Sequence, residues 1–400
     1  MGRSTARRAR ANVMRSARGR RSRSLRAAGV CLAALLTFAG GSSAAWGVGS
    51  PGAARRSVTP DGFRAQSMSW ISPDHGWLLG SGPCGQATCT TVVATVDGGA
   101  SWTTLGTMDA PLSFGERKSG VDQIRFADDL HGWAFGPALW ATNDGGVTWK
   151  RRVPPGGGRQ VPALAGDADG VYAVVSPCHF NRPISRCHDR STLWRTMPGQ
   201  GSWTQVPLTL PVTRDATLVV RGAVAYLVVP TLDSPRPDVL AATVDGQHWS
   251  RRSAPCNKGE DEFLAGVAPI SDRKVALMCE AYIGFGKAEK RVLRSSDTGR
   301  STTSAGTLPL YGIVSQLAAA PNGTLVVATS SIGSWIYRDA RGRTWTTPVD
   351  IGDGGQGWND VVFTTNRIGF VIHGPAACCG GHGSGELGGT TDGGITWAPL

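Results

Sequence analysis

Short apolar runs separated by polar turns recur along most of the chain. In one stretch, an apolar run at 121–126 is followed by a polar turn, a second run at 133–135 and a third run at 139–142. Runs of this length that are rich in β-branched and aromatic residues, with Gly, Asp and Pro at their ends, are typical of β-strands. Beyond residue 45 no segment has the spacing of an amphipathic helix. The pattern therefore predicts an all-β chain.

The predicted strands are organised around a repeated turn of the form Thr-x-Asp-Gly-Gly-x-x-Trp. Three copies are complete and four are degenerate, and the copies end at Trp102, Trp149, Trp203, Trp249, Thr302, Trp345 and Trp397. Successive copies end about 50 residues apart, which is the length of a four-stranded propeller blade. The sequence therefore predicts a single β-propeller of about seven four-stranded blades over residues 66–400.

Each residue type in the repeated turn has a structural explanation. A carboxylate such as that of Asp97 can accept hydrogen bonds from N–H groups of its own turn, and the glycines supply positive φ angles. The tryptophan is expected to pack over the turn, where burying about 200 Å² of indole contributes roughly 5 kcal/mol before entropy. The aspartates could instead be calcium ligands or catalytic acids, but one unit keeps the repeat without its aspartate, which favours a turn clamp. The predicted structural residues are Asp97, Trp102, Asp144, Trp149, Trp203, Asp245, Trp249, Asp297, Asp339, Trp345, Asp392 and Trp397.

The pattern Ser/Thr-x-Asp-x-Gly-x-x-Trp resembles the Asp box of bacterial neuraminidase (BNR) repeats. Units such as HGWAFG…ALWATNDGGVTW resemble the propellers of the photosystem II assembly and stability factor family, and also sialidase-like and sortilin-like propellers. The resemblance covers residues 66–400 and implies the fold, but not one activity. By analogy with the assembly factors, it implies a scaffold role.

A sialidase on this fold would need residues that the sequence supplies only in part. The resemblance would require an arginine triad, an early Arg-Ile-Pro signature and a tyrosine nucleophile with a partner glutamate. Tyr282 near Glu280 is the one suggestive pair, and residues 180–184 are only a scrambled form of the signature. Sialidases usually have six blades, whereas seven units are present here. A glycoside hydrolase is therefore the alternative hypothesis, and a protein without enzymatic activity is favoured.

The first 45 residues have the pattern of a secretory signal peptide. An arginine-rich start precedes the apolar run 27–41, and the small residues 43–45 resemble a cleavage site. The run is shorter than the ~20 residues of a transmembrane helix, although an uncleaved anchor is the alternative. Residues 46–65 are then a linker or a strand that closes the ring. We expect the protein to be secreted or held at the cell envelope.

The formal net charge of +12 is concentrated in this leader. Without the leader's ten arginines, 31 basic residues face 29 acidic ones, so the body has a net charge of about +2 and no nucleic-acid partner is expected. No nucleotide-binding or metalloprotease motif is present, and no cofactor is predicted. We expect a monomer with a protein or glycan partner outside the membrane, and membrane contact only if the signal is uncleaved.

Eight cysteines follow residue 45, and an even number in an exported chain indicates disulfides. Because turns alternate between the two ends of an antiparallel blade, all eight map to the face opposite the repeated turns. We expect these pairs to brace long loops there: Cys84–Cys89, Cys178–Cys187, Cys256–Cys279 and a vicinal Cys378–Cys379 bridge.

Braced loops often carry binding groups. The basic loop 178–188 and the loop 373–383 could be interpreted as zinc sites, but their spacing matches no standard zinc pattern, so no metal site is predicted. The candidate binding residues are His179, Arg182, Arg186, His188, Glu280, Tyr282, His373 and His382. The predicted function is that of an exported, non-catalytic binding or scaffold module.

Overall fold

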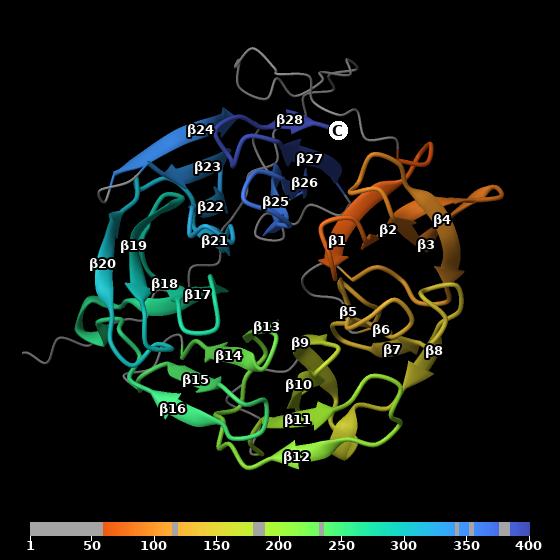
Figure 1. The fold of residues 1–400 in the computed structure, drawn as a ribbon, viewed down its shortest axis with the longest axis horizontal. Helices are drawn as coiled ribbons and strands as arrows, with labels where there is room; N and C mark the ends of the chain where they lie inside the picture. The colour runs from red at the N-terminus through yellow and green to blue at the C-terminus, as the bar shows by residue number, and fades with distance from the viewer. Residues whose placement is uncertain are drawn as a thin grey trace, which may run out of the picture. The chain divides into compact units, whose positions relative to one another are not determined.

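The computed structural model describes residues 59–113, 119–178, 189–231, 236–340, 344–351, 356–375 and 385–400. All of them belong to one unit, residues 44–400. They form seven four-stranded antiparallel sheets, arranged as blades around a central axis (Figure 1). The described part of the chain has no α-helix and two short 3-10 turns, η1 (Pro155–Gly157) and η3 (Lys258–Glu260). The predicted all-β propeller of about seven blades is confirmed.

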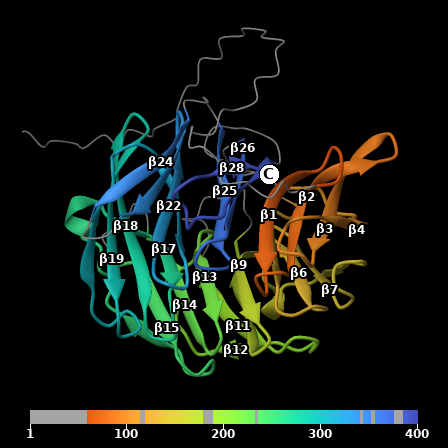
Figure 2. The same ribbon diagram turned by 45° about the horizontal axis from the view of Figure 1, so that its top comes forward.

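Each blade consists of four consecutive strands, and the first strand of each lies nearest the axis (Figures 1 and 2). Blades 1 and 2 contain β1 (Arg64–Trp70), β2 (Gly76–Cys84), β3 (Ala87–Thr95), β4 (Thr103–Met108), β5 (Gln123–Phe126), β6 (Gly132–Phe135), β7 (Leu139–Thr142) and β8 (Lys150–Arg152). Blades 3 and 4 contain β9 (Gln160–Asp167), β10 (Gly170–Ser176), β11 (Thr192–Thr196), β12 (Thr204–Val206), β13 (Thr217–Arg221), β14 (Val224–Val229), β15 (Val239–Thr243) and β16 (Ser250–Arg252). Blades 5 and 6 contain β17 (Phe263–Pro269), β18 (Val275–Gly284), β19 (Lys287–Ser295), β20 (Thr303–Thr307), β21 (Val314–Ala319), β22 (Leu325–Ser330), β23 (Ser334–Asp339) and β24 (Trp345–Ile351). Blade 7 contains β25 (Gln356–Phe363), β26 (Gly369–Pro375), β27 (Glu386–Thr390) and β28 (Ala398–Pro399).

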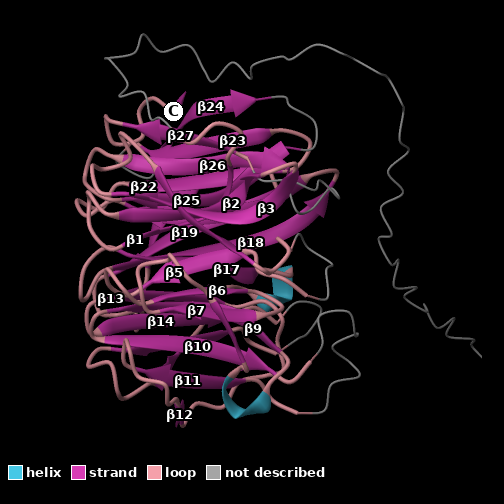
Figure 3. Ribbon diagram, turned by 90° about the vertical axis from the view of Figure 1, so that its right-hand side faces the viewer, coloured by secondary structure: helices cyan, strands magenta, loops and turns pink. Residues whose placement is uncertain are grey.

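The connections between strands form two different faces (Figure 3). We call the face with the turns between the first and second strands, and between the third and fourth, the repeat face. These two kinds of turn touch within a blade: the Gly98 N–H donates to the Asp74 carbonyl at 2.9 Å, and the Gly145 N–H donates to the Leu130 carbonyl at 3.0 Å. The opposite face carries the hairpins between the second and third strands and the crossings between blades, and we call it the hairpin face.

Side-chain hydrogen bonds hold the turns of the repeat face. In blade 1, the Asp97 carboxylate accepts the Ser101 N–H at 2.9 Å, the Ser101 hydroxyl at 2.6 Å and the Thr95 hydroxyl at 2.7 Å. The Thr95 oxygen in turn accepts the Gly99 N–H at 2.9 Å. Glycine is favoured here because Gly98 and Gly99 both have positive φ, at 71° and 81°. We call this arrangement the aspartate turn.

The aspartate turn recurs around Asp144, Asp297 and Asp392, and a shorter form surrounds Asp245. Blade 3 has no aspartate at this point, and the Thr196 hydroxyl instead donates to the Ser202 carbonyl at 2.7 Å. In blade 6, the Asp339 carboxylate instead accepts a hydrogen bond from the Arg294 guanidinium of blade 5 at 2.5 Å. The connection between the third and fourth strands therefore persists in blades where the aspartate or some of its hydrogen bonds are missing.

The tryptophans that follow the turns pack between neighbouring blades. Trp149 of blade 2 joins a cluster with Trp77 of blade 1, and Trp397 of blade 7 lies in the cluster shared with blade 6. Trp102 of blade 1 packs beside Phe370 of blade 7. The buried cores of the described residues therefore lie between the sheets, and each tryptophan contributes to the interface with the preceding blade.

The first and last blades meet without sharing a strand among the described residues. Ala65 forms two backbone hydrogen bonds with Gly385 of blade 7, as an isolated bridge, while β1 pairs with β2 of its own blade. The last blade is completed by β28. The Asp360 carboxylate of blade 7 also accepts the Met68 N–H of blade 1 at 3.1 Å. Among residues 59–65, the backbone pairing with blade 7 is this single bridge. Residues 46–58 lie outside the described residues, so a linker or a ring-closing strand at 46–65 stays a prediction.

Candidate functional site

Disulfides brace the hairpin face. Cys84–Cys89 closes the hairpin between β2 and β3, and Cys256–Cys279 ties the crossing from blade 4 to blade 5 onto β18. These are two of the four expected pairs. Cys178 is also disulfide-bonded. The other predicted disulfide residues, Cys187, Cys378 and Cys379, lie outside the described residues.

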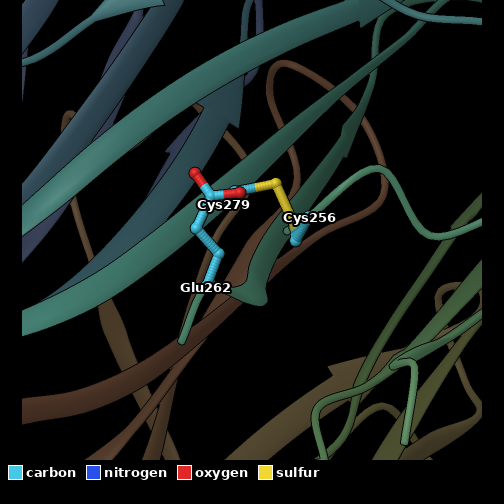
Figure 4. A group of neighbouring side chains, drawn as sticks. All are labelled: Cys256, Glu262 and Cys279. Carbon is cyan, nitrogen blue, oxygen red and sulfur yellow. A yellow bond between two sulfur atoms is a disulfide. The ribbon is translucent and has the colours of Figure 1, made fainter. Parts of the chain in front are cut away.

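The Cys256–Cys279 region contains one group of three metal-ligating residue types, shown in Figure 4. The two sulfur atoms are bonded to each other and lie near the Glu262 carboxylate. That carboxylate accepts the Asn257 N–H and an Arg291 N–H, both at 2.7 Å. Both cysteines are used in the disulfide, and the Glu262 carboxylate is hydrogen-bonded to Asn257 and Arg291. These three residues therefore stabilise the crossing between blades 4 and 5.

Three of the eight predicted binding residues fall in the part of the chain that the structure describes. His179, Arg182, Arg186, His188 and His382 lie outside the described residues. His373 is described, and it differs from the expectation of an exposed loop residue. It lies in β26, is 5% exposed, and its ring is 4.7 Å from that of Trp358. Its Nε2 is 3.2 Å from the Ser334 hydroxyl. His373 is part of β26, which ends at Pro375, and not part of the loop that follows. Its ring is therefore held in the interior, between Trp358 and Ser334.

Glu280 and Tyr282 both lie in β18 but have different surroundings. Glu280 is 1% exposed and pairs in register with Lys290 of β19. Tyr282 is 55% exposed, and its ring meets Phe263 edge-on at 5.1 Å. Burial raises the pKa of Glu280 and lowers the pKa of Lys290, while their mutual attraction opposes both shifts. The two residues of the suggestive pair therefore do not form one site: Glu280 is buried beside Lys290, and Tyr282 is at the surface.

The Lys290 ammonium ties the crossing between blades 5 and 6 to β19. It donates to the carbonyls of Ala288 at 3.0 Å, Leu310 at 3.3 Å and Gly312 at 2.9 Å. Two of these three carbonyls belong to the crossing. The buried cation thus fixes the backbone directly beneath an exposed part of the hairpin face.

Exposed apolar side chains gather on this part of the hairpin face. We call the group the apolar patch, and its members are Tyr282, Ile283, Phe285, Leu310, Tyr311 and Ile332. They make up six of the twelve exposed large hydrophobic side chains of the described residues, and they come from adjacent segments of blades 5 and 6. Phe285 is 97% exposed and Ile332 is 71% exposed. The other six side chains come from separate turns and a crossing in other blades.

Backbone contacts hold the segments of the apolar patch together. The Gly312 N–H donates to the Gly286 carbonyl at 3.1 Å, and the Ala288 N–H donates to the Leu310 carbonyl at 2.8 Å. The Ser331 hydroxyl of the neighbouring hairpin also donates to the Gly286 carbonyl, at 2.9 Å. Phe285 itself has a positive φ of 52°, which is uncommon for a residue with a side chain. The patch is therefore a fixed surface built from three segments.

A cavity lies on the axis of the ring, apart from the apolar patch. This central cavity has a volume of about 660 Å³ and is lined by the innermost strands of all seven blades. Its charged lining residues are Asp122, Arg125, Arg221 and Asp360. Arg125 donates to the Met68 carbonyl at 3.0 Å and lies 3.8 Å from Asp360. Arg125 and Asp360 therefore link blades 2, 1 and 7.

The central cavity contains residues that were not predicted from the sequence. Burial raises the pKa of Asp122 to about 7, and Arg125 opposes that shift. Burial also raises the pKa of Asp360, again against the effect of Arg125. Aspartate is depleted in strands. The presence of Asp122 directly before β5 and of Asp360 within β25 was therefore the one sequence signal that these residues could have a special role. Nothing in the sequence showed that these two residues line one cavity.

Comparison with known proteins identifies the fold. No protein-family model matches the sequence, and no curated protein matches it. Among solved structures, YCF48 bound to D1 peptide superposes with a TM-score of 0.51 and 18% identity, over 79% of this chain and 92% of that chain. YCF48 from Cyanidioschyzon merolae has a TM-score of 0.53 and 15% identity, over 84% of this chain and 97% of that one. The fold is therefore shared with YCF48, a photosystem II assembly factor, as the resemblance predicted.

A glycoside hydrolase is also among the similar structures. The GH74 xyloglucanase from Xanthomonas campestris has a TM-score of 0.34 and 14% identity, over 84% of this chain and 72% of that chain. That score is too low to support an inference about activity. No helix in the described part of the chain is long and apolar enough to span a bilayer.

Proposed function

We propose that this protein is an exported, non-catalytic binding module whose hairpin face docks a protein partner through the apolar patch. The observation that supports it most directly is the concentration of exposed Phe, Tyr, Ile and Leu side chains on two adjacent blades. Soluble proteins rarely expose contiguous apolar groups without an interaction that covers them. Aromatic residues are also enriched at the centres of protein interfaces.

The construction of the apolar patch suits docking. Lys290, Gly286 and Ser331 hold its three segments in place through hydrogen bonds to backbone carbonyls or N–H groups. A preformed surface loses less conformational entropy on binding than a mobile one. Lys287 lies over the Tyr311 ring at 5.4 Å and adds a cation at the edge of the patch. The partner surface is therefore expected to be apolar with an acidic margin.

The shared fold supports a protein partner. YCF48 is described with a D1 peptide bound, so a propeller of this kind can hold a polypeptide. At 18% identity, this likeness concerns the fold alone. The chemistry of the partner is therefore inferred from the apolar patch of the present chain.

Export is part of the proposal. The disulfides Cys84–Cys89 and Cys256–Cys279 suit an oxidising compartment. The leader 1–45 has the order of a signal peptide, with basic, apolar and small residues in succession. We assign residues 66–400 to the module that acts outside the membrane, as a monomer.

A photo-cross-linking amino acid tests the docking site. It would be placed at position 285 in the apolar patch and, as a matched control, at position 153, where Val153 is 81% exposed in another crossing. Irradiation in the native envelope is expected to give a discrete protein adduct from position 285 and none from position 153. Equal adducts from both positions, or no protein adduct from position 285, would contradict the proposal.

Glycoside hydrolysis is the second hypothesis, and Asp122 is the observation that favours it. This carboxyl lines the central cavity, and a raised pKa is typical of a general acid. Glu280, the earlier candidate, is not part of the cavity lining. A fluorogenic glycoside panel that includes sialosides tests the hypothesis. Turnover lost in Asp122→Asn but kept in the exposed control Asp272→Asn would make the chain a glycosidase, whereas absence of turnover would leave the binding module.

A further inference from the structure

The Cys256–Cys279 region brings together a set of ligand atoms that neither the docking proposal nor the central cavity uses. Cys256 lies in the crossing from blade 4 to blade 5, Cys279 lies in β18, and Glu262 directly precedes β17 (Figure 4). The two sulfur atoms and a Glu262 carboxylate oxygen all lie within 4.8 Å of one another. Three segments of the chain therefore hold two sulfur ligands and one oxygen ligand close together.

The disulfide is the oxidised form of two metal ligands. A dithiol reductant supplies the two electrons and two protons that convert it into two thiols, and is itself oxidised to a disulfide. Two thiolates on one tetrahedral zinc ion lie ~3.8 Å apart, at Zn–S distances of ~2.3 Å. The Cα atoms of Cys256 and Cys279 are 5.5 Å apart. This backbone spacing suits either a disulfide or two ligands of one metal ion.

Glu262 is held in place as an oxygen ligand. It is 9% exposed, and its Oε2 accepts the Asn257 N–H and an Arg291 N–H, both at 2.7 Å. Its Oε1 accepts a second Arg291 N–H at 3.2 Å. A carboxylate has about four acceptor positions, so one position on Oε1 remains for a metal ion. Hydrogen bonds of this kind orient metal ligands in other sites.

The charges of the reduced region favour a divalent cation. Burial acts to raise the pKa of Glu262, but the hydrogen bonds from Arg291 and Asn257 lower it overall, so Glu262 is a carboxylate at neutral pH. Two thiolates and this carboxylate carry three negative charges, and Arg291 carries one positive charge beside them. A divalent cation brings the total to zero. Lys258 of the same crossing is already paired with Asp238 at 2.8 Å and does not alter this balance.

The ligand types and their burial favour zinc. Thiolate ligands select soft or borderline cations such as Zn²⁺ over Ca²⁺ and Mg²⁺. Cys279 is fully buried, whereas Cys256 is only partly buried. An ion can therefore enter from the side of the crossing, where water is available as a fourth ligand.

We infer that the reduced Cys256–Cys279 pair binds one Zn²⁺ ion together with Glu262, through two sulfur atoms and one oxygen atom. A water molecule completes the tetrahedron. Binding converts the two thiols into thiolates and releases two protons. The ion ties the crossing to β18 while the cysteines are reduced, and formation of the disulfide releases it. This inference does not depend on the apolar patch or on its partner.

Cobalt and zinc titrations of the chain without its leader test the inference. The protein is reduced with a dithiol, which is then removed in the absence of oxygen. Co²⁺ bound by thiolates gives a charge-transfer absorption in the near ultraviolet. The reduced protein is expected to bind one more Co²⁺ per chain than reduced Cys256→Ser, and Zn²⁺ is expected to displace it. The comparison with Cys256→Ser subtracts any ion held by the other cysteines.

The contribution of the carboxylate is tested with both thiols in place. Glu262→Gln is expected to weaken the zinc affinity at least about 10-fold, the lower end of the loss caused by removing a partner of a metal ligand. Glu260→Gln, an exposed position in the same crossing, is the matched control and should leave the affinity unchanged. Competition with a chromogenic chelator measures the affinities, and thermal melts of the oxidised variants show that each is folded.

Four results would overturn the inference. They are equal numbers of ions on the reduced protein and on Cys256→Ser, equal affinities of Glu262→Gln and Glu260→Gln, equal binding by the oxidised and reduced protein, and a reduced chain that stays unfolded when zinc is added. Docking through the apolar patch is measured on the oxidised protein. Failure of the zinc site and failure of the proposed function are therefore distinguishable.

Discussion

The two faces of the propeller are joined to the same strands but are built differently. On the repeat face, the turns around Asp97 and Asp392 have the same set of hydrogen bonds although they stand in the first and last blades. On the hairpin face, the connections differ in length, three of them contain disulfide-bonded cysteines among the described residues, and one region forms the apolar patch. A turn that repeats in several blades indicates a structural task, whereas recognition is expected from connections that differ between blades.

The strongest test of the structural side is Trp102, which packs between blades 7 and 1 and is 6% exposed. Trp102→Ala is expected to lower the free energy of unfolding by about 3–5 kcal/mol, because it leaves a cavity in that interface. Thr302 occupies the equivalent position of blade 5, so Thr302→Ala is the matched control with a small effect. Urea denaturation measures both variants, and equal losses would show that the tryptophan is not the source of the stability.

The interface between blades 4 and 5 has no repeat tryptophan and instead contains Cys256 and Cys279. Replacing both cysteines by serine is expected to cost about 3 kcal/mol, because the disulfide closes a loop with a sequence separation of 23. The Cys84–Cys89 bridge spans a separation of only 5, and its double serine variant should lose about 2 kcal/mol. Thermal melts of the two variants decide the order, and a larger loss for the shorter loop would contradict this account.

The aspartate turns give a weaker, pH-dependent contribution. The hydroxyl and N–H of Ser101 hold the pKa of Asp97 at about 2, below its usual value. A carboxylate with a depressed pKa stabilises the fold above about pH 4, and this stabilisation is lost as the pH falls toward 2. Asp97→Ala is therefore expected to cost about 1 kcal/mol at pH 7 and almost nothing near pH 2. A difference that stays constant across this range would refute the turn clamp.

The smallest effect on stability is expected at the apolar patch. Phe285 is 97% exposed, so Phe285→Ser should change the free energy of unfolding by less than about 0.5 kcal/mol. The melting temperature measures it. A loss comparable to that of Asp97→Ala would mean that the patch supports the fold rather than recognition.

The fold could be predicted because the information is local and repeated. Asp144, its two glycines and Trp149 specify a turn within eight residues, and a similar order recurs about every 50 residues. The predicted strand at 139–142 coincides with β7, because its ends are marked by a Pro-Ala turn and by the aspartate turn. Local signals of this kind are independent of the rest of the chain.

The candidate sites could not be predicted in the same way, because they depend on how blades are placed beside one another. Ile283 and Phe285 resemble buried strand residues in the sequence, but they extend past the neighbouring crossing and are exposed. Asp122 and Asp360 lie far apart in the chain and come together only when the ring closes. His373 was assigned to a loop because the glycine-rich segment after it concealed the end of β26.

The most direct test of the difference between the faces is a comparison of three forms of the oxidised protein in one affinity capture from the native envelope. Phe285→Ser alters the hairpin face, and Val96→Ser alters an exposed apolar residue of an aspartate turn on the repeat face, where Val96 is 75% exposed. Quantitative mass spectrometry would compare the captured proteins. We predict a partner that is retained by the unaltered protein and by Val96→Ser and lost with Phe285→Ser. Equal capture by all three forms, or loss with Val96→Ser alone, would contradict the account.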